Sequence, residues 1–204
     1  MMNLIRRQLA TVLTLVAALA ALGTVPSPAS AQDGPGIQYQ LHNCKMPSTT
    51  VRWSDQTGGG AYGQQAIEAA ASWDSATPLT MQLVGASPIH IIADQSYWGK
   101  TDWAGLTQGA GGGIPSCTSV MGVWQNLPLK IMLNTYFTDD YPANKKQSVF
   151  AHEMGHALGI FHQSHPGTTC GGLGLMYYTV AFRYDVCGQF LPQTDDVAAI
   201  HYIY

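Results

Sequence analysis

Three histidines and one glutamate stand close together in residues 151–162, which read A-H-E-M-G-H-A-L-G-I-F-H. An α-helix turns about 100° per residue, so His152 and His156 project from nearly the same face, one turn apart. Two imidazoles placed in this way can share one Zn²⁺. Glu153 is adjacent to the first of them and can reach a neighbouring coordination position of the same ion.

The third histidine, His162, lies beyond one further turn, and on a continuous helix it would point roughly 240° away from His156. It can reach the same metal only if the helix stops between the two. Gly159 is the residue that can stop it, by adopting a left-handed conformation at the helix end. The spacing therefore predicts a helix from about Asn144 to Leu158, capped by Asn144, and a zinc site formed by His152, His156 and His162.

Three protein ligands leave zinc one position for water, which is the arrangement of catalytic rather than structural zinc. Zinc lowers the pKa of such a water to around 7. Glu153 can then take its proton and pass it to a leaving amine, so we predict one catalytic Zn²⁺ and Glu153 as the catalytic base. H-E-x-x-H alone also occurs by chance in helices with surface histidines, but five positions coincide here, which favours the metal site. The other histidines lack partner spacing and are predicted to be surface or core residues: His42, His90, His165 and His201.

Apolar periodicity predicts a mixture of short strands and helices around this motif. Residues 94–119 are predicted to be a loop. Their glycine-rich stretch Gly109–Gly113 is predicted to be a surface loop rather than a phosphate-binding loop, because it lacks the Gly-Lys-Ser/Thr ending. Strands are expected at 51–54, 79–84, 89–93 and 129–133, one helix at 62–74, and a closing helix capped by Thr194. Strands and helices in this order imply an α+β or mixed α/β domain.

Residues 1–31 have the features of a secretory signal peptide. A positive pair, Arg6 and Arg7, precedes the uncharged apolar stretch Leu9–Leu22, and Ala29-Ser30-Ala31 supplies small residues at the cleavage positions. The alternative is a transmembrane anchor, but the stretch is shorter than the about 20 residues that a bilayer requires. We therefore predict export and no membrane span in the mature form.

Composition narrows the possible partners and the compartment. The net charge of −3 comes without a basic stripe, so nucleic acid is not a predicted partner. An even number of cysteines in an exported chain favours disulfides, and the absence of a C-x-x-C pair disfavours a cysteine metal site. The four are Cys44, Cys117, Cys170 and Cys187. We expect an irregular lead-in at 32–50 and a catalytic domain at 51–204.

The zinc motif resembles that of the metzincin metallopeptidases and, within them, most nearly that of the matrixins. Leu175-Met176-Tyr177 resembles the Met-turn of the family, a tight turn whose methionine lies beneath the metal. The segments 66–80, 131–134 and 195–204 resemble the first helix with its following strand, the strand before the active-site helix, and the closing helix of matrixins.

The resemblance implies a metzincin-like α+β catalytic domain with a twisted mixed sheet, two long helices, a cleft, and a small irregular C-terminal subdomain after Gly159. It also implies a secreted, extracellular zinc metalloendopeptidase that hydrolyses peptide bonds in protein or peptide substrates by zinc-activated water, often before an apolar residue. We expect a monomer. The predicted disulfides are Cys170–Cys187, which would staple the chain around the Met-turn, and Cys44–Cys117, by elimination.

Several residues depart from the matrixin pattern. Gln163 follows the third histidine, where matrixins usually have serine, and residues 90–105 lack the full ligand set for a structural calcium or a second zinc. Tyr178 stands two residues after Met176, where astacin-like and serralysin-like relatives place a tyrosine that reaches the zinc and matrixins usually have proline. Tyr178 is therefore either an oxyanion donor or a wall residue of the substrate pocket.

Two further functions stay open at this stage. One is a secreted binding protein that keeps the zinc site without turnover, against which Glu153 argues, because a structural site needs no general base. The other is a zinc hydrolase of non-peptide amides or esters, whose chemistry at the carbonyl is the same.

Overall fold

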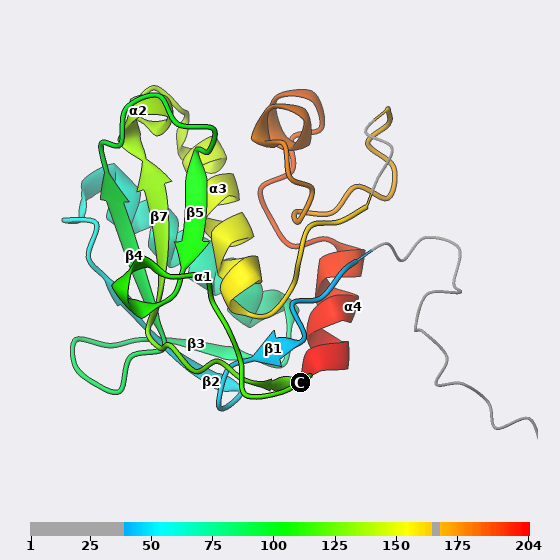
Figure 1. Cartoon of the computed structure of the whole chain (residues 1–204). Coiled ribbons are helices and arrows are strands. Elements are labelled where there is room, and N and C mark those ends of the chain that lie inside the picture. The colour runs from blue at the N-terminus through cyan, green and yellow to red at the C-terminus, as the bar shows by residue number, and fades with distance from the viewer. Residues whose placement is uncertain (1–38, 165–167) are drawn as a thin grey trace, which may run out of the picture. The chain divides into compact units, whose positions relative to one another are not determined.

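The computed structural model describes residues 39–164 and 168–204. The predicted signal peptide at 1–31, the first part of the lead-in at 32–50, and His165 lie outside the described residues. The fold is α+β, as predicted, with a mixed five-stranded sheet, two long helices and a C-terminal part that contains little regular structure (Figure 1).

The five-stranded sheet has the strand order β3-β2-β4-β7-β5. The first four strands run parallel, and β5 is an antiparallel edge strand that pairs with β7. All four parallel strands lie where apolar and β-branched segments predict them. The bounds are Thr50–Asp55 for β2, Thr80–Leu83 for β3, Ile91–Ser96 for β4, Gly105–Gln108 for β5 and Leu129–Asn134 for β7.

The edge strand β5 corrects the prediction that residues 94–119 form a loop. That prediction is also wrong over the end of β4 and over a short 3₁₀ helix, η1, at Ala110–Gly112. The residues of β5, Gly-Leu-Thr-Gln, are all half-buried. Their sequence shows no alternation of apolar and polar residues, so a periodicity analysis does not detect the strand. Its position depends on tertiary pairing, with Gly105 opposite Leu133 of β7.

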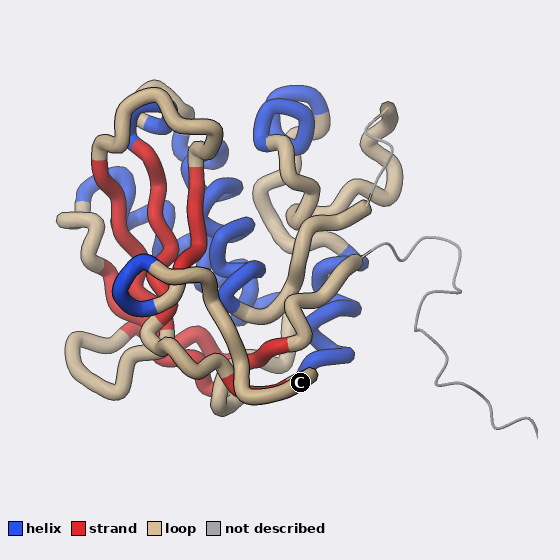
Figure 2. The backbone as a smooth tube through the Cα atoms, in the orientation of Figure 1, coloured by secondary structure: helices blue, strands red, loops and turns tan. Residues whose placement is uncertain are grey.

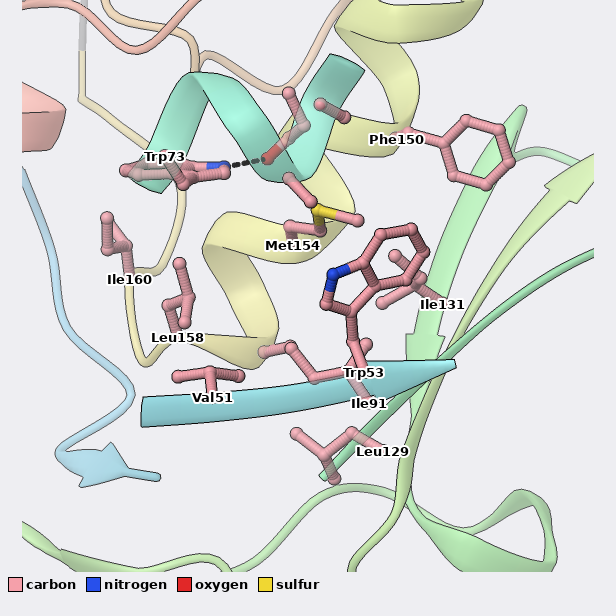
Figure 3. Packing of buried hydrophobic residues seen from close by; sticks show 14 of the residues in the cluster. Val51, Trp53, Trp73, Ile91, Leu129, Ile131, Phe150, Met154, Leu158 and Ile160 are labelled. Carbon is pink, nitrogen blue, oxygen red and sulfur yellow. Dashed lines mark hydrogen bonds between the residues drawn. The ribbon is translucent and has the colours of Figure 1, made fainter. Parts of the chain in front are cut away.

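The two long helices are α1, Gly60–Ala76, and α3, Ala143–Ala157, and they pack against each other and the sheet. The indole nitrogen of Trp73 on α1 donates a 2.9 Å hydrogen bond to the carbonyl oxygen of Ala151 on α3 (Figure 3). Trp53, Trp73 and Phe150 are fully buried in the core between these layers. Side chains of this kind contribute about 1.5–3 kcal/mol each on burial, so α3 rests on a well-packed base.

Both predicted helix caps are displaced by one or two residues. The N-cap of α3 is Pro142 rather than Asn144, and no side chain caps this helix. The last helix, α4 at Thr194–Ile203, is capped by Gln193 rather than Thr194, through a capping box with Asp196. Glutamine is not among the preferred N-cap residues, which explains why the sequence pointed to the threonine beside it.

The chain between α3 and α4 is mainly loop (Figure 2). Among its described residues, the one regular piece is a short π-helix, η2, at Ala181–Val186. The disulfide Cys170–Cys187 closes this segment. Its Met-turn therefore lies within a covalent loop, as predicted.

The lead-in holds the chain that follows α3. Its two-residue strand β1, Cys44–Lys45, pairs with β6, Gly122–Val123, and the disulfide Cys44–Cys117 ties it to the body. The backbone N–H of His42 donates to the carbonyl oxygen of Gly159 at 2.8 Å. Both predicted disulfides are thus confirmed.

Gly159 ends α3 in the way that the spacing predicts. Its φ is +107°, and the N–H groups of Gly159 and Ile160 donate to the carbonyl oxygens of His156 and Gly155, each at 3.0 Å. This pair of bonds is a Schellman motif. A Cβ on residue 159 would collide with the carbonyl oxygen of Cys44, so glycine is required for space as well as for φ.

Gly159→Ala is expected to lower the free energy of unfolding by about 1–2 kcal/mol for the positive φ and by about 1–3 kcal/mol more for the overpacking. Gly188 is a matched control, since it follows η2 with φ of +68° and open space where a Cβ would go. Gly188→Ala should show the first loss without the second. Urea unfolding of the zinc-free, disulfide-intact protein measures both, and equal losses would show that the contact with Cys44 is unimportant.

Candidate metal centre and cleft

The imidazoles of His152, His156 and His162 meet at the C-terminal end of α3. Nε2 of His156 lies 3.2 Å from Nε2 of His162. The ring centroid of His152 lies 4.7 Å from that of His156 and 5.3 Å from that of His162. One ring nitrogen from each histidine can be chosen so that all three lie within 4.8 Å of one another. Within residues 39–164 and 168–204, this is the one group of histidine, cysteine and acidic side chains with such spacing.

Backbone carbonyls orient two of these rings. Nδ1 of His156 lies 2.9 Å from the carbonyl oxygen of Ile160, and Nδ1 of His152 lies 2.8 Å from that of Leu175. Because a carbonyl only accepts, each Nδ1 carries the proton and each Nε2 keeps its lone pair. A guanidinium nitrogen of Arg183 also lies 2.9 Å from Nδ1 of His152; in the tautomer that leaves Nε2 free for a metal, Nδ1 donates to the Leu175 carbonyl oxygen and this guanidinium nitrogen donates to the Tyr177 carbonyl oxygen instead.

All three imidazoles are neutral at pH 7. Burial disfavours the charged form, so it lowers the pKa of His156 to about 3 and the pKa of His152 well below its usual value. Burial also lowers the pKa of His162. Two lone pairs that face each other at 3.2 Å repel unless a proton or a cation lies between them.

Zn²⁺ fits this arrangement. Tetrahedral zinc with Zn–N bonds of 2.0–2.1 Å places its ligand nitrogens about 3.3 Å apart, close to the separation seen between His156 and His162. Neutral imidazole is a common zinc ligand, and a carbonyl acceptor on the second ring nitrogen is the usual outer partner. His152, His156 and His162 are therefore able to hold the ion with one position left open.

The carboxyl group of Glu153 lies against β5. Thr107 Oγ1 is 2.8 Å from Glu153 Oε2 and 2.9 Å from the Glu153 backbone carbonyl, so its single proton can serve either. A Cβ on Gly105 would lie 2.6 Å from Glu153 Oε1, so only glycine lets β5 come this close. Burial raises the pKa of Glu153 to about 7, although the Thr107 hydrogen bond and Arg183 oppose the rise. A nearby cation would lower this pKa again.

The predicted Met-turn packs against α3 beside the histidines. Met176 is fully buried, and a Cβ on Gly155 of α3 would collide with its sulfur. The carboxylate of Asp196 on α4 accepts hydrogen bonds from the N–H groups of Leu175, at 2.7 Å, and Met176, at 3.1 Å. Since the Leu175 carbonyl in turn accepts from His152, Asp196 orients that imidazole through one intervening peptide unit.

A sequence model of the matrixin peptidase family matches residues 52–204. The chain belongs to the matrixin family. The predicted resemblance is thereby confirmed, and family membership implies a zinc endopeptidase. Among curated proteins, none matches the chain.

Gln163 stands where matrixins usually have serine, and its longer side chain joins two segments of the chain. Its side-chain carbonyl accepts from the N–H of Gly174 at 2.6 Å, and its amide donates to Gly172 and Asp195 at 2.8 Å and 3.1 Å. Its own N–H donates to the carbonyl oxygen of Met176 at 2.8 Å. The residue after the third histidine therefore holds the Met-turn segment to α4.

Arg183 is a structural residue of the site that the sequence analysis missed. It is 2% exposed, its Nε donates to Ser148 Oγ at 3.1 Å, and its guanidinium also donates to the Tyr177 carbonyl oxygen. Burial lowers its pKa only to about 10, so it stays charged and joins η2 to α3. Nothing in the sequence marked it, because arginine is usually exposed.

The site opens into a cleft of about 900 Å³ between β5 and α3 on one side and the C-terminal part on the other. His42, predicted to be a surface or core residue, is half-buried and lines this cleft with its ring 5.5 Å from that of His156, and it is not part of the three-histidine group. His90 is buried and His201 exposed, as predicted. The lining also includes residues 101–108 and 112–115, Trp124, Phe137, Tyr141, Val149, Phe161, residues 178–180, and Arg183.

Asp196→Asn should weaken zinc binding about 10-fold or more, because the Leu175 carbonyl loses its fixed position beside His152. An amide in this place turns one acceptor oxygen into a donor, so a backbone N–H is left unpaired at a cost of about 1–3 kcal/mol. Competition with a chromophoric chelator measures the zinc affinity. Asp185→Asn is the matched control, since it removes the same charge from an exposed ion pair with Lys145. Parent-like zinc affinity in Asp196→Asn would show that Asp196 does not orient His152 through the Leu175 carbonyl.

Proposed function

We propose that this matrixin is an exported zinc endopeptidase in which His152, His156 and His162 hold one Zn²⁺ and Glu153 is the general base. The observation that carries the proposal is the convergence of three neutral imidazoles next to a buried carboxyl group whose pKa is raised. A structural zinc site has four protein ligands and no need of such a group. Perturbed carboxyl groups in clefts are typical of catalytic acids and bases.

The chemistry divides between the ion and the side chains. A zinc ion held by the three histidines would supply a water of pKa around 7 and polarise the substrate carbonyl. Glu153 accepts a proton at a carboxylate oxygen and later donates it to the leaving amine. Thr107 holds one oxygen of that carboxylate, so the other is the one free to move the proton. The contacts of Nδ1 with Leu175 and Ile160 keep the imidazoles in place.

The edge strand β5 has a free edge with which an extended polypeptide substrate can pair. It is the last strand in the sheet order, and all of its residues line the cleft. A substrate segment can add to such an edge by main-chain hydrogen bonds. The antiparallel alignment is the more stable of the two pairings, and it runs the substrate from the Gln108 end of β5 toward the Gly105 end.

The two other functions are less well supported by these observations. A binding protein without turnover has no use for a buried carboxyl group held by Thr107 at the metal. A hydrolase of small amides or esters has no use for an edge strand along the whole cleft. Peptide hydrolysis uses both features.

Export, the domain boundaries and the monomeric state are part of the proposal. Two disulfides are typical of oxidising compartments outside the cytosol. Among the described residues, no helix is both long and apolar enough to cross a membrane. With residues 1–31 as a signal peptide, the mature chain would contain the lead-in and the catalytic domain at 51–204.

Glu153→Ala should retain zinc, because the three imidazoles remain, and lose about 10² to 10⁴-fold in turnover through loss of the general base. Zinc content by elemental analysis and hydrolysis of an unstructured protein are the two measurements. Glu68→Ala on α1 is the control, since Glu68 lies outside the cleft lining. Full activity of zinc-loaded Glu153→Ala would exclude Glu153 as the base.

Tyr178→Phe separates the two predicted roles of Tyr178. The side chain is 63% exposed, lines the cleft, and its ring lies 6.2 Å from that of His162, so both roles remain predictions. An oxyanion donor predicts a fall of about 10² to 10³-fold in kcat with little change in KM. A wall residue predicts parent-like kinetics, because the ring is kept. Tyr202→Phe, an exposed tyrosine on α4, is the control for hydroxyl removal.

A further inference from the structure

A group of exposed aromatic side chains borders one end of the cleft, and we propose that it is a docking platform for the part of the polypeptide substrate that extends beyond the cleft. The platform consists of Tyr97, Trp98 and Tyr136, which are 71%, 51% and 44% exposed. Large apolar side chains that are exposed singly are ordinary, but here the rings of Tyr97 and Tyr136 are in contact and Trp98 follows Tyr97 in the chain, and grouped exposed side chains mark interaction sites. The proposal rests on the peptidase function proposed above and names a further substrate-binding surface for it.

The platform is continuous with the cleft. The ring of Tyr97 lies 5.8 Å from that of Tyr136, which lies 4.8 Å from that of Phe137. The ring of Trp98 lies 6.2 Å from that of Trp103. Because Phe137 and Trp103 both line the cleft, two aromatic contacts lead from it to the exposed rings.

One buried amide holds both segments that carry the platform. Asn134 at the end of β7 is fully buried, and its Oδ1 accepts from the N–H of Trp98 at 3.0 Å and of Tyr136 at 3.1 Å. Its Nδ2 donates to the carbonyl oxygen of Gly99 and to Thr101 Oγ1, both at 2.9 Å. The loop after β4 and the short helix α2, Thr135–Thr138, are therefore fixed to each other. Rings on a fixed backbone bind at a smaller entropic cost than rings on a free loop.

The position of the platform indicates which part of the substrate reaches it. Trp103 lies just before Gly105, where β5 begins. A substrate strand antiparallel to β5 brings its C-terminal side, the leaving-amine side of the cleaved bond, to this end. The charged residues within four positions of the three rings are Asp94, Lys100, Asp102, Asp139 and Asp140, and Asp94 is paired with Lys130. We therefore assign the platform to apolar or aromatic side chains several residues after the scissile bond.

The test uses two fluorogenic peptides that share one core sequence and differ in a C-terminal extension. One extension is apolar and aromatic, and the other is a Gly/Ser extension of equal length. For the zinc-loaded full chain, the apolar extension should raise kcat/KM about fivefold or more, mainly through KM, whereas the Gly/Ser extension should not. The gain should disappear in Trp98→Ala and persist in Tyr202→Ala, which removes an equally exposed aromatic ring from α4. Thermal unfolding confirms that both variants are folded.

Three results would overturn the proposal. The first is an equal gain from the apolar extension in Trp98→Ala and in the parent. The second is a gain that appears only when the same extension is placed on the N-terminal side. The third is a loss in Trp98→Ala of retention on an insoluble polysaccharide with unchanged peptide kinetics, which would make the platform a carbohydrate surface.

A binding measurement separates failure of this inference from failure of the peptidase function. Fluorescence anisotropy gives the affinity of both labelled peptides for zinc-loaded Glu153→Ala, with and without Trp98→Ala. If the parent cleaves no peptide, yet the apolar extension tightens binding only when Trp98 is present, the peptidase function is wrong and the platform stands. If the parent cleaves both peptides but Trp98 affects neither binding nor kinetics, the platform is wrong and the peptidase function stands.

Discussion

At Gly159 the backbone leaves α3 with a positive φ, and this turn lets His162 face the two histidines on the helix. The Schellman bonds close the helix end, and the carbonyl of Cys44 occupies the space that any side chain at residue 159 would need. The lead-in pairs with the chain immediately after the turn, so the direction of that chain is fixed from both sides. Without this stop, two imidazoles would share a face and the third would point away.

The described chain between α3 and α4 is mainly loop, so side-chain contacts set its shape. Asp196 on α4 holds the Met-turn, and the same turn supplies the carbonyl that orients His152. Gln163 ties the chain after the third histidine to α4, and Arg183 ties η2 to α3. These contacts tie the irregular segment to α3 and α4, which is how it holds His162 and the Met-turn in a defined geometry.

The sequence predicted the parts of the fold that depend on local spacing. The histidine spacing placed the helix and its end, the parallel strands followed from apolar segments, and the even number of cysteines, two of them on either side of Met176, led to the disulfide around it. What it missed depends on tertiary contacts. The edge strand β5 has no apolar alternation, and buried Arg183 looks like any surface arginine. His42 is distant in sequence from His156, so no spacing rule brings the two rings together.

X-ray absorption at the zinc K-edge of the zinc-loaded chain tests most directly whether the turn at Gly159 brings three imidazoles to one ion. The proposed three-histidine site predicts nitrogen and oxygen ligands at about 2.0–2.1 Å with outer-shell scattering from three imidazoles. It further predicts that His162→Ala lowers the imidazole count by one. An unchanged count in that variant, or a sulfur ligand at about 2.3 Å, would contradict the account.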